Sequence, residues 1–285
     1  MNDQPIFEEL RLKEFLAERL PDVDPRLLPS RAKLMGGVAL IRLRPELDEL
    51  EEEIGRLLLE FYRVKAAYRI YGVTGVERRP MIKHLAGDEV KEIIHREYGC
   101  CFKFDLTRLM LCLGNSFERL RMAALTRDGE IVLDMFAGIG QFTIPIAVLS
   151  NPSKIYSIEL NPEAYKYLLE NIKLNGVEDK VQAILGDCVK IAPRKFKGIA
   201  DRIIMGYFHG TMKALSAALL ALKPIGGVIH FHELARRGSE ERFVRQIIEE
   251  IESQGFLARL LGWRKVKSYS KTKNHIVIDL FAIRR

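Results

Sequence analysis

One segment, residues 131–142 (IVLDMFAGIGQF), constrains the fold of this chain more than any other. Its three branched apolar residues predict a buried strand that ends at an acid, Asp134. Gly138 and Gly140 then allow a sharp turn and a close approach of the backbone to a ligand, before an apolar helical run begins. The spacing D-x-F-x-G-x-G is neither the G-x-G-x-x-G of dinucleotide sites nor a P-loop with its lysine. Pyrophosphate binding is therefore the weaker interpretation.

Two further strand-like segments also end in acids. The segment KIYSIEL reaches Glu159, where a ribose-binding carboxylate is expected in sheets of this type, and VQAILGD ends at Asp187. Between them, residues 162–176 carry apolar residues at helical spacing and stop at a glycine. Strand ends capped by solvated acids are the alternative explanation. Three such ends in series, each followed by a helical segment, favour a ligand site at one edge of a sheet.

The chain has 285 residues, of which 48% are hydrophobic, so it is long enough for two domains with real cores. No window approaches about 18 uninterrupted apolar residues, and the N-terminus MNDQPIFEEL carries acids instead of a signal region. We therefore expect a cytoplasmic protein with no membrane association. The four cysteines are scattered, which suggests neither a zinc site nor a disulfide framework. The net charge of +7 allows a polyanionic partner but is weak evidence for one.

Residues 1–112 are expected to form a small α/β domain of about 110 residues, within the usual size range. The expected elements are an amphipathic helix within residues 1–30, a strand over 31–43, a helix over 45–64, two short strands, a helix around 89–97 and a strand from residue 100. This domain lacks an acid-glycine turn or a catalytic constellation.

Basic residues alternate with tyrosines in this first domain. They are Arg63, Lys65, Arg69, Arg78, Arg79, Lys83 and Arg108, among Tyr62, Tyr68 and Tyr71. Such a mixture suits RNA phosphates and unstacked bases. A solvated basic surface with core tyrosines explains the pattern equally well.

A helix is expected from about Ser116, with Ser116 as its N-cap, just upstream of the glycine turn. It carries Glu118, Arg119 and Arg121. A guanidinium here could hold the carboxylate of a bound amino-acid moiety through two parallel hydrogen bonds. A surface helix with solvated charges remains open on spacing alone.

The fourth strand of the second domain ends in the sequence IIMGYFHGT. Its end, from Gly206 through Tyr207 and Phe208 to His209, should line the ligand site. An aromatic ring there could stack on a base, and a histidine could move a proton near neutral pH. A merely exposed loop histidine is the alternative.

The fifth strand, GVIHFHEL, places two histidines on one face, but without a clear third ligand a metal site is improbable. The chain then continues with an amphipathic helix and two strands that form a hairpin around the basic loop KVKSYSKTK, residues 265–273. That loop is a second candidate for contact with RNA.

Several segments together resemble one family. They are GNSFERLRMA, VLDMFAGIGQFTIP, IELNPEAYKYLLENIKLN, DRIIMGYFHGT, GVIHFHE and SYS…HIVIDL. The chain, from about Lys33 onward, resembles the archaeal aminocarboxypropyltransferases of wyosine biosynthesis, relatives of the tRNA methyltransferases that modify the guanosine beside the anticodon. The GYFHGT segment discriminates best, because the methyltransferases usually carry an asparagine-leucine-proline type tripeptide there. The resemblance implies an α/β fold, with a Rossmann-like class I S-adenosylmethionine-dependent transferase domain over 113–285 after the small domain over 1–112.

The resemblance also implies a reaction and a set of binding residues. The family transfers the 3-amino-3-carboxypropyl group of S-adenosylmethionine to a ring carbon of a tricyclic base in tRNA(Phe), releasing methylthioadenosine. Arg119 is then expected to hold the carboxylate of S-adenosylmethionine, Glu159 its ribose, and Asp187 with Cys188 its adenine. The full expected binding set is Cys112, Arg119, Asp134, Phe136, Ala137, Gly138, Gly140, Glu159, Leu160, Asn161, Asp187, Cys188 and Gly206. Cys112 falls where relatives tend to have serine.

Tyr207 and His209 are the catalytic candidates, and no metal is expected. The expected partner is the anticodon stem-loop of tRNA(Phe), held by the first domain and the loop over 265–273, with no obligate protein partner. Two alternatives stay open: methylation of guanosine 37 at N1 by the same fold, and a catalytically silent RNA-binding module.

Overall fold

The computed structural model describes residues 4–75, 78–208 and 210–285. These residues divide into two compact units. The first comprises Met1–Arg96 and Phe102–Met110, and the second comprises Glu97–Cys101 and Leu111–Arg285. The domain boundary after residue 112 expected from the sequence stays a prediction.

The first unit is built on a four-stranded sheet in the order β1-β2-β3-β4. Its elements are α1 (Gln4–Arg19), β1 (Lys33–Met35), β2 (Val38–Ile41), the 3₁₀ helix η1 (Pro45–Leu50), α2 (Glu51–Tyr62), β3 (Ala66–Thr74) and β4 (Arg79–Gly87). Strands β2 and β3 are parallel, so α2 serves as their crossover connection. Leu12 and Leu16 of α1 and Ile54 and Leu58 of α2 are fully buried in one core with the sheet.

Residues 92–97 form a strand, β5 (Glu92–Glu97), where a helix was expected. Strand β5 joins β6 (Cys100–Asp105) in a two-stranded sheet through a turn at Gly99, whose φ is 78°. Within β5, Ile93 is buried and both of its neighbours are exposed. That alternation is the period-2 pattern of a strand, so pairing with β6 overrode the helical preference of the charged residues.

The second unit contains a seven-stranded sheet in the order β12-β13-β11-β10-β7-β8-β9. Its elements are η2 (Leu113–Asn115), α3 (Ser116–Leu125), β7 (Ile131–Asp134), α4 (Thr143–Leu149), β8 (Lys154–Glu159), α5 (Pro162–Leu174), β9 (Val181–Leu185), α6 (Cys188–Lys195), β10 (Arg202–Met205), α7 (Thr211–Ala221), β11 (Gly227–Arg236), α8 (Glu240–Ser253), β12 (Phe256–Ser268) and β13 (Lys273–Arg284). Strands β7 to β11 pair in parallel, and β13 runs antiparallel between β11 and β12. This is the Rossmann-like arrangement expected from the sequence.

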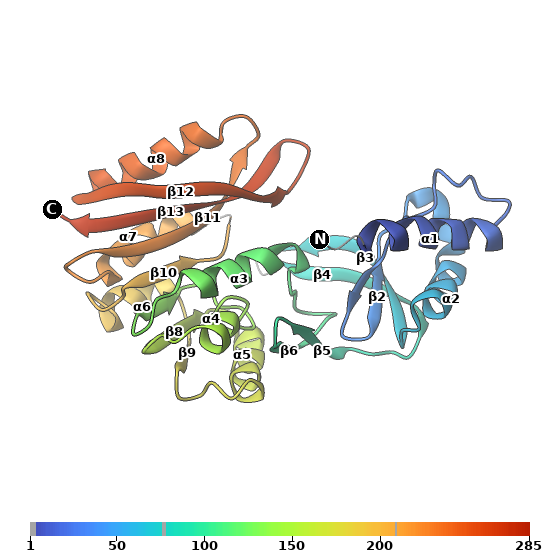
Figure 1. The fold of residues 1–285 in the computed structure, drawn as a ribbon, viewed down its shortest axis with the longest axis horizontal. Coiled ribbons are helices and arrows are strands. Elements are labelled where there is room, and N and C mark those ends of the chain that lie inside the picture. Colours follow the sequence, from blue (N-terminus) through green and yellow to red (C-terminus); the bar gives the residue numbers. More distant parts are fainter. Residues whose placement is uncertain (1–3, 76–77, 209) are drawn as a thin grey trace. The chain divides into compact units, whose positions relative to one another are not determined.

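Helices cover both faces of this sheet (Figure 1). Helices α6, α7 and α8 share one apolar core with the strands, while α3 and α4 pack together with α5 on the other side. The sequence explains this burial, because β10 reads as a continuous apolar run and all four of its residues are buried.

The strand order reverses at β7, so the carboxyl ends of β7, β8 and β10 meet at one edge of the sheet, where ligands of such folds bind. The hairpin between β12 and β13 reaches the same edge, because Lys273 at the start of β13 pairs with Arg236 at the end of β11. Strand β12 is irregular, with register shifts at Leu260/Gly262 and Lys265/Lys267.

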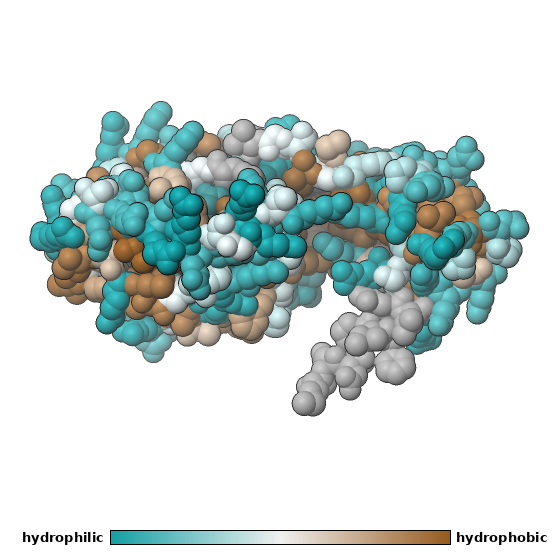
Figure 2. All heavy atoms as spheres, turned by 90° about the horizontal axis from the view of Figure 1, so that it is seen from above, coloured by the Kyte–Doolittle hydropathy of each residue, from teal (hydrophilic) through white to brown (hydrophobic). Residues whose placement is uncertain are grey.

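Hydrophilic side chains dominate the face shown in Figure 2, and hydrophobic residues form smaller patches there. No helix within the described part of the chain is long and apolar enough to cross a membrane.

Candidate cofactor site

The glycine turn follows β7 at the carboxyl edge of the sheet. Gly138 and Gly140 both have left-handed backbones, with φ of 57° and 95°. A Cβ on Gly140 would lie 2.7 Å from Cγ1 of Ile144. The left-handed backbone and this close contact therefore both exclude larger residues at position 140. The turn therefore needs both glycines, as the sequence predicted.

Asp134 lies beneath this turn. Its side chain is fully buried, its Oδ2 accepts a hydrogen bond from Oγ1 of Thr143 at 2.8 Å, and its Oδ1 accepts one from the Phe136 N–H at 3.3 Å. Burial raises the pKa of Asp134 to about 6, because no cation compensates for the lost water. In this structure its carboxyl group holds the turn from below, and its expected contact with the cofactor stays a prediction.

Glu159 connects the turn to the next strand. Its Oε2 accepts from the Gly138 N–H at 2.6 Å, and its Oε1 accepts from the Asn161 N–H at 2.7 Å. Asn161 in turn caps α5 by accepting from the Glu163 N–H at 2.9 Å, and the neighbouring Leu160 is 68% exposed. Each carboxylate oxygen can accept more than one hydrogen bond, so Glu159 has capacity for hydroxyl groups as well.

Asp187 and Cys188 follow β9, at the start of α6. Asp187 caps α6 by accepting from the Val189 N–H at 2.9 Å. Cys188 is buried, and burial raises the pKa of its thiol to about 12. The thiol therefore stays neutral and offers packing instead of a nucleophile.

Arg119 has internal partners in this structure, and its expected contact with a ligand carboxylate stays a prediction. It is fully buried, and its Nε and Nη2 donate to the two oxygens of Glu97 at 2.8 Å each, while Nη1 donates to the Cys112 carbonyl at 2.8 Å. The solvated-helix interpretation is wrong, because Glu118 is also fully buried. The bidentate face expected to hold a ligand carboxylate holds Glu97 in this structure.

Helix α3 also begins differently from the expectation. Asn115 is its N-cap and Ser116 its first residue, and the Ser116 hydroxyl donates to the hydroxyl of Tyr98 at 3.3 Å.

The segment before α3 is tied to the glycine turn and to β12. The Cys112 N–H donates to Oε1 of Gln141 in the glycine turn at 3.2 Å. Nζ of Lys267, on β12, lies 2.6 Å from Sγ of Cys112 and 3.0 Å from Oδ1 of Asn115. Sequence reasoning assigned Lys267 to RNA and missed this contact, because 155 residues separate the two partners and nothing local signals it.

Aromatic rings gather at the end of β10. A Cβ on Gly206 would lie 2.5 Å from Cε2 of Phe142, so only glycine allows this close approach. Tyr207 follows, and its ring stacks on Phe136 of the glycine turn with a centroid separation of 5.4 Å. Tyr207 thus contacts the glycine turn. His209 lies outside the described residues.

The two histidines of β11 are internal. His230 Nδ1 lies 2.6 Å from Oδ1 of Asp279, and Nη1 of Arg202 lies 2.6 Å from His230 Nε2. His232 Nδ1 lies 3.1 Å from Nε2 of His275. Burial lowers the pKa of both β11 histidines, so they stay neutral near pH 7. In the described part of the chain, no group of three or more metal-ligating residues comes together.

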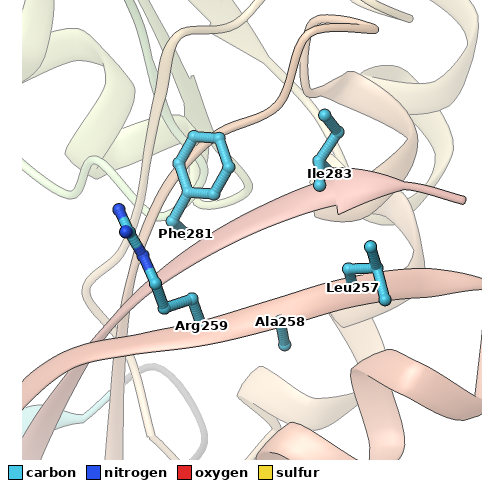
Figure 3. A pocket seen from close by; sticks show the side chains of 5 residues that line it. All are labelled: Leu257, Ala258, Arg259, Phe281 and Ile283. Atoms are coloured by element: carbon cyan, nitrogen blue, oxygen red, sulfur yellow. The ribbon is translucent and has the colours of Figure 1, made fainter.

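A surface hollow of about 310 Å³ lies elsewhere in the second unit (Figure 3). Leu257, Ala258, Arg259, Phe281 and Ile283 line it. Ala282 pairs with Gly227 at the start of β11, so the hollow lies at the edge of the sheet opposite to the glycine turn. Its lining offers one charged group and no carboxylate, which does not suit a nucleoside cofactor.

The geometry at the carboxyl edge agrees with comparisons to known proteins. Residues 93–257 match the TRM5/TYW2 methyltransferase domain, and residues 12–90 match the TYW2 N-terminal domain. The chain belongs to the TRM5/TYW2 family. The tRNA(Phe) (4-demethylwyosine(37)-C(7)) aminocarboxypropyltransferase of Methanocaldococcus jannaschii is 40% identical over 246 residues, which cover 86% of this chain and 95% of that relative.

Two further members of the TRM5/TYW2 family are similar over most of the chain. The crystal structure of Pyrococcus horikoshii TYW2 in complex with MeSAdo superimposes with a TM-score of 0.82 at 34% identity, covering 97% of this chain and all of that one. The tRNA (guanine(37)-N(1))-methyltransferase Trm5b of Pyrococcus abyssi is 34% identical over 257 residues, 89% of this chain and 75% of that relative. The family and the Rossmann-like fold expected from the sequence are confirmed.

Proposed function

We propose that this protein transfers the 3-amino-3-carboxypropyl group of S-adenosylmethionine to the tricyclic wyosine-type base at position 37 of tRNA(Phe), releasing methylthioadenosine. The observation that carries the proposal is the 40% identity to an aminocarboxypropyltransferase over 95% of that relative's length. The match of residues 12–90 to the TYW2 N-terminal domain supports the same branch of the family.

The residues at the carboxyl edge fit S-adenosylmethionine. Glu159, already bonded to the Gly138 N–H, would accept the ribose hydroxyls, and Asp187 with Cys188 would contact the adenine. Leu160, Asn161, Phe136, Ala137 and Gly206 complete the proposed lining. The bound sulfonium supplies three carbons open to displacement, so the outcome depends on which carbon is held in line with the nucleophile. Tyr207, stacked on Phe136, is the proposed contact nearest the acceptor, and His209 remains the second catalytic candidate.

Arg119 enters the proposal as a positioning residue. Its guanidinium links Glu97 to the Cys112 carbonyl, which fixes the segment that Gln141 also contacts. Arg119→Lys keeps the charge but loses the bidentate pair, so thermal stability and cofactor affinity should fall together. A loss of cofactor affinity without any loss of stability would indicate direct contact instead.

The deciding experiment supplies S-adenosylmethionine labelled either in its carboxyl group or in its methyl group to the protein with hypomodified tRNA(Phe). We expect the carboxyl label to enter the RNA, methylthioadenosine to form, and the mass of the anticodon-loop nucleoside to rise by one aminocarboxypropyl group. Entry of the methyl label alone would overturn the proposal.

Methylation of guanosine 37 at N1 is the second candidate, because Trm5b of Pyrococcus abyssi is 34% identical. The same assay with tRNA(Phe) carrying an unmodified guanosine at position 37 tests it. Methyl transfer to that RNA would favour this candidate, and binding of tRNA without any binding of S-adenosylmethionine would favour a silent RNA-binding module.

The binding residues are tested by calorimetry with S-adenosylmethionine. Glu159→Gln should weaken binding by about 10-fold or more, because a charged acceptor of hydroxyl hydrogen bonds is lost. Glu170→Gln, on α5 beside Lys166, is the matched control and should leave the affinity unchanged. Equal affinities of both variants would remove Glu159 from the site.

A further inference from the structure

A row of aromatic rings runs from the glycine turn to the hairpin between β12 and β13. Phe136 stacks on Tyr207 at 5.4 Å, and the Tyr207 ring lies nearly parallel to that of Phe208, with 10° between the planes and 6.3 Å between centroids. Phe208 in turn meets the Tyr269 ring edge-on at 5.4 Å. Residues far apart in the sequence thus form one row of contacting rings, in which the plane of Tyr269 stands at 77° to that of Phe208.

Exposure along this row rises toward the hairpin. Phe208 is 7% exposed and rests on His275, with 5.0 Å between ring centroids, whereas Tyr269 is 39% exposed. Tyr207 is intermediate. Buried rings therefore support the row from beneath, and Tyr269 presents a large aromatic side chain to solvent where a packing role alone would bury it.

The hairpin that carries Tyr269 is held in place. The N–H groups of Tyr269 and Ser270 both donate to the Lys273 carbonyl, at 3.0 and 3.1 Å. Lys267, two residues before Tyr269, is fixed by Cys112 and Asn115. A ring that is positioned in advance loses little conformational freedom when a ligand stacks on it.

Cations surround Tyr269 on the hairpin tip and the neighbouring turn. Lys271, Lys273 and Arg237 are exposed, and Nη2 of Arg237 donates to the Ser270 carbonyl at 3.3 Å, which brings the turn after β11 against the tip. An exposed aromatic ring flanked by cations matches the chemistry of single-stranded RNA, in which an unstacked base lies between two phosphates.

We infer that Tyr269 is a stacking residue for the acceptor base, which adds an exposed ring on the hairpin to the site that Tyr207 lines. The inference rests on the proposed function, which supplies the RNA base and its size. A tricyclic base has a larger face than guanine, so an added ring on the hairpin contributes to selection of the acceptor as well as to its binding.

A binding cycle with the full-length protein tests the inference. Affinity is measured for tRNA(Phe) that carries the tricyclic acceptor at position 37 and for the same tRNA with an abasic site there. The unchanged protein should lose about 10-fold in affinity when the base is removed, the range expected for one stacked base. Tyr269→Ala should bind the acceptor RNA about 10-fold more weakly and should discriminate less between the two RNAs than the unchanged protein does.

Three further variants make the outcome decisive. Tyr269→Phe keeps the ring and should bind both RNAs as the unchanged protein does. Tyr269→Leu keeps an apolar contact with Phe208 but should discriminate less between the acceptor RNA and the abasic RNA. Leu257→Ala, an exposed apolar residue at the opposite end of β12, should leave both affinities unchanged. An equal loss of affinity for both RNAs in Tyr269→Ala, or no loss, would overturn the inference. Absence of aminocarboxypropyl transfer by the unchanged protein would instead overturn the proposed function.

Discussion

The β3–β4 surface of the first unit and the β12–β13 hairpin tip of the second have the same composition, with basic residues beside tyrosines, yet their cations are placed differently. In the first unit Arg69 is 5% exposed, and its two terminal nitrogens donate to Oε2 of Glu51 at 2.7 Å and to Oδ1 of Asp48 at 2.6 Å. Lys83 pairs with the other oxygen of Glu51. Both cations are therefore paired with a carboxylate of the same unit.

At the hairpin tip the arrangement is reversed. Lys271 and Lys273 are exposed on either side of Thr272, and the nearby tyrosine is also open to solvent. In the first unit Tyr68 is buried and its hydroxyl donates to the Val90 carbonyl at 2.6 Å, whereas Tyr71 is 51% exposed but its hydroxyl donates to Oε2 of Glu51 at 3.3 Å.

The difference teaches that an acid on a distant element decides whether a cation is available for RNA. Glu51 lies 18 residues before Arg69 and 32 before Lys83, on the helix that crosses between β2 and β3. The basic residues of both regions look alike in the sequence, but Arg69 and Lys83 are paired with Glu51, whereas Lys271 and Lys273 are exposed at the hairpin tip.

The largest expected effect is the loss of stability on removing Glu51. Glu51→Ala leaves Arg69 buried without its buried partner, so the free energy of unfolding should fall by about 3 kcal/mol or more. Glu52→Ala is the control, because Glu52 is exposed and lies 3.9 Å from Arg56, and its loss should cost less than about 0.5 kcal/mol. Denaturant titration measures both, and equal effects would show that Arg69 finds water without Glu51.

The pH dependence of stability should have opposite signs for Asp134 and Glu51, because Asp134 is buried without the cations that pair with Glu51. Lys83 and Arg69 lower the pKa of Glu51, whereas burial raises that of Asp134 to about 6. Between about pH 4 and pH 6 the folded protein keeps the Asp134 proton that the unfolded chain releases, so stability falls as the pH rises through this window. Asp134→Asn should remove this loss, which amounts to at most about 3 kcal/mol. If the stabilities of the unchanged protein and of Asp134→Asn had the same pH dependence in denaturant titrations, this prediction would be wrong.

The contrast between the two surfaces is sharpened by the salt dependence of tRNA binding. Replacing Lys271 and Lys273 by alanine should reduce the slope of log K against log salt by about 1 for each phosphate that the variant no longer neutralises. Lys83→Ala, in the first unit, should leave the slope unchanged. A reduced slope in Lys83→Ala would mean that this lysine exchanges Glu51 for a phosphate.

The smallest expected effect is that of Lys267→Ala, which should differ from the replacement of the exposed lysines at the tip of the same hairpin. Lys267→Ala should leave the salt slope unchanged, because its ammonium is engaged with Cys112 and Asn115. The loss of these hydrogen bonds should lower the free energy of unfolding by about 1 kcal/mol. A reduced slope without any loss of stability would assign Lys267 to the RNA surface after all.

Local features of the sequence predicted the centre of the second unit well. Strand β7, its glycines and the acids at the ends of β7, β8 and β9 are encoded within a few residues of one another, so periodicity and turn chemistry were sufficient. The parallel order then brings those ends to one edge of the sheet without further information.

Features that depend on distant partners could not be predicted. Helical propensity favoured a helix around 89–97, but pairing with β6 decides that segment. The spacing of α3 places Arg119 near the cofactor turn, but only the fold shows that Glu97, 22 residues earlier, occupies its guanidinium. For the same reason the sequence did not connect Lys267 to Cys112.

The register shift between Lys265 and Lys267 has a consequence for the evolution of this hairpin. In a regular strand, residues three apart face opposite sides, yet Arg264 contacts Glu118 and Lys267 contacts Asn115, both next to the same helix. The extra residue, Val266, makes this possible. Deleting it would rotate every side chain beyond it to the other side of the sheet. A substitution at the tip therefore leaves the anchor intact, whereas shortening the strand leading there by one residue dismantles it.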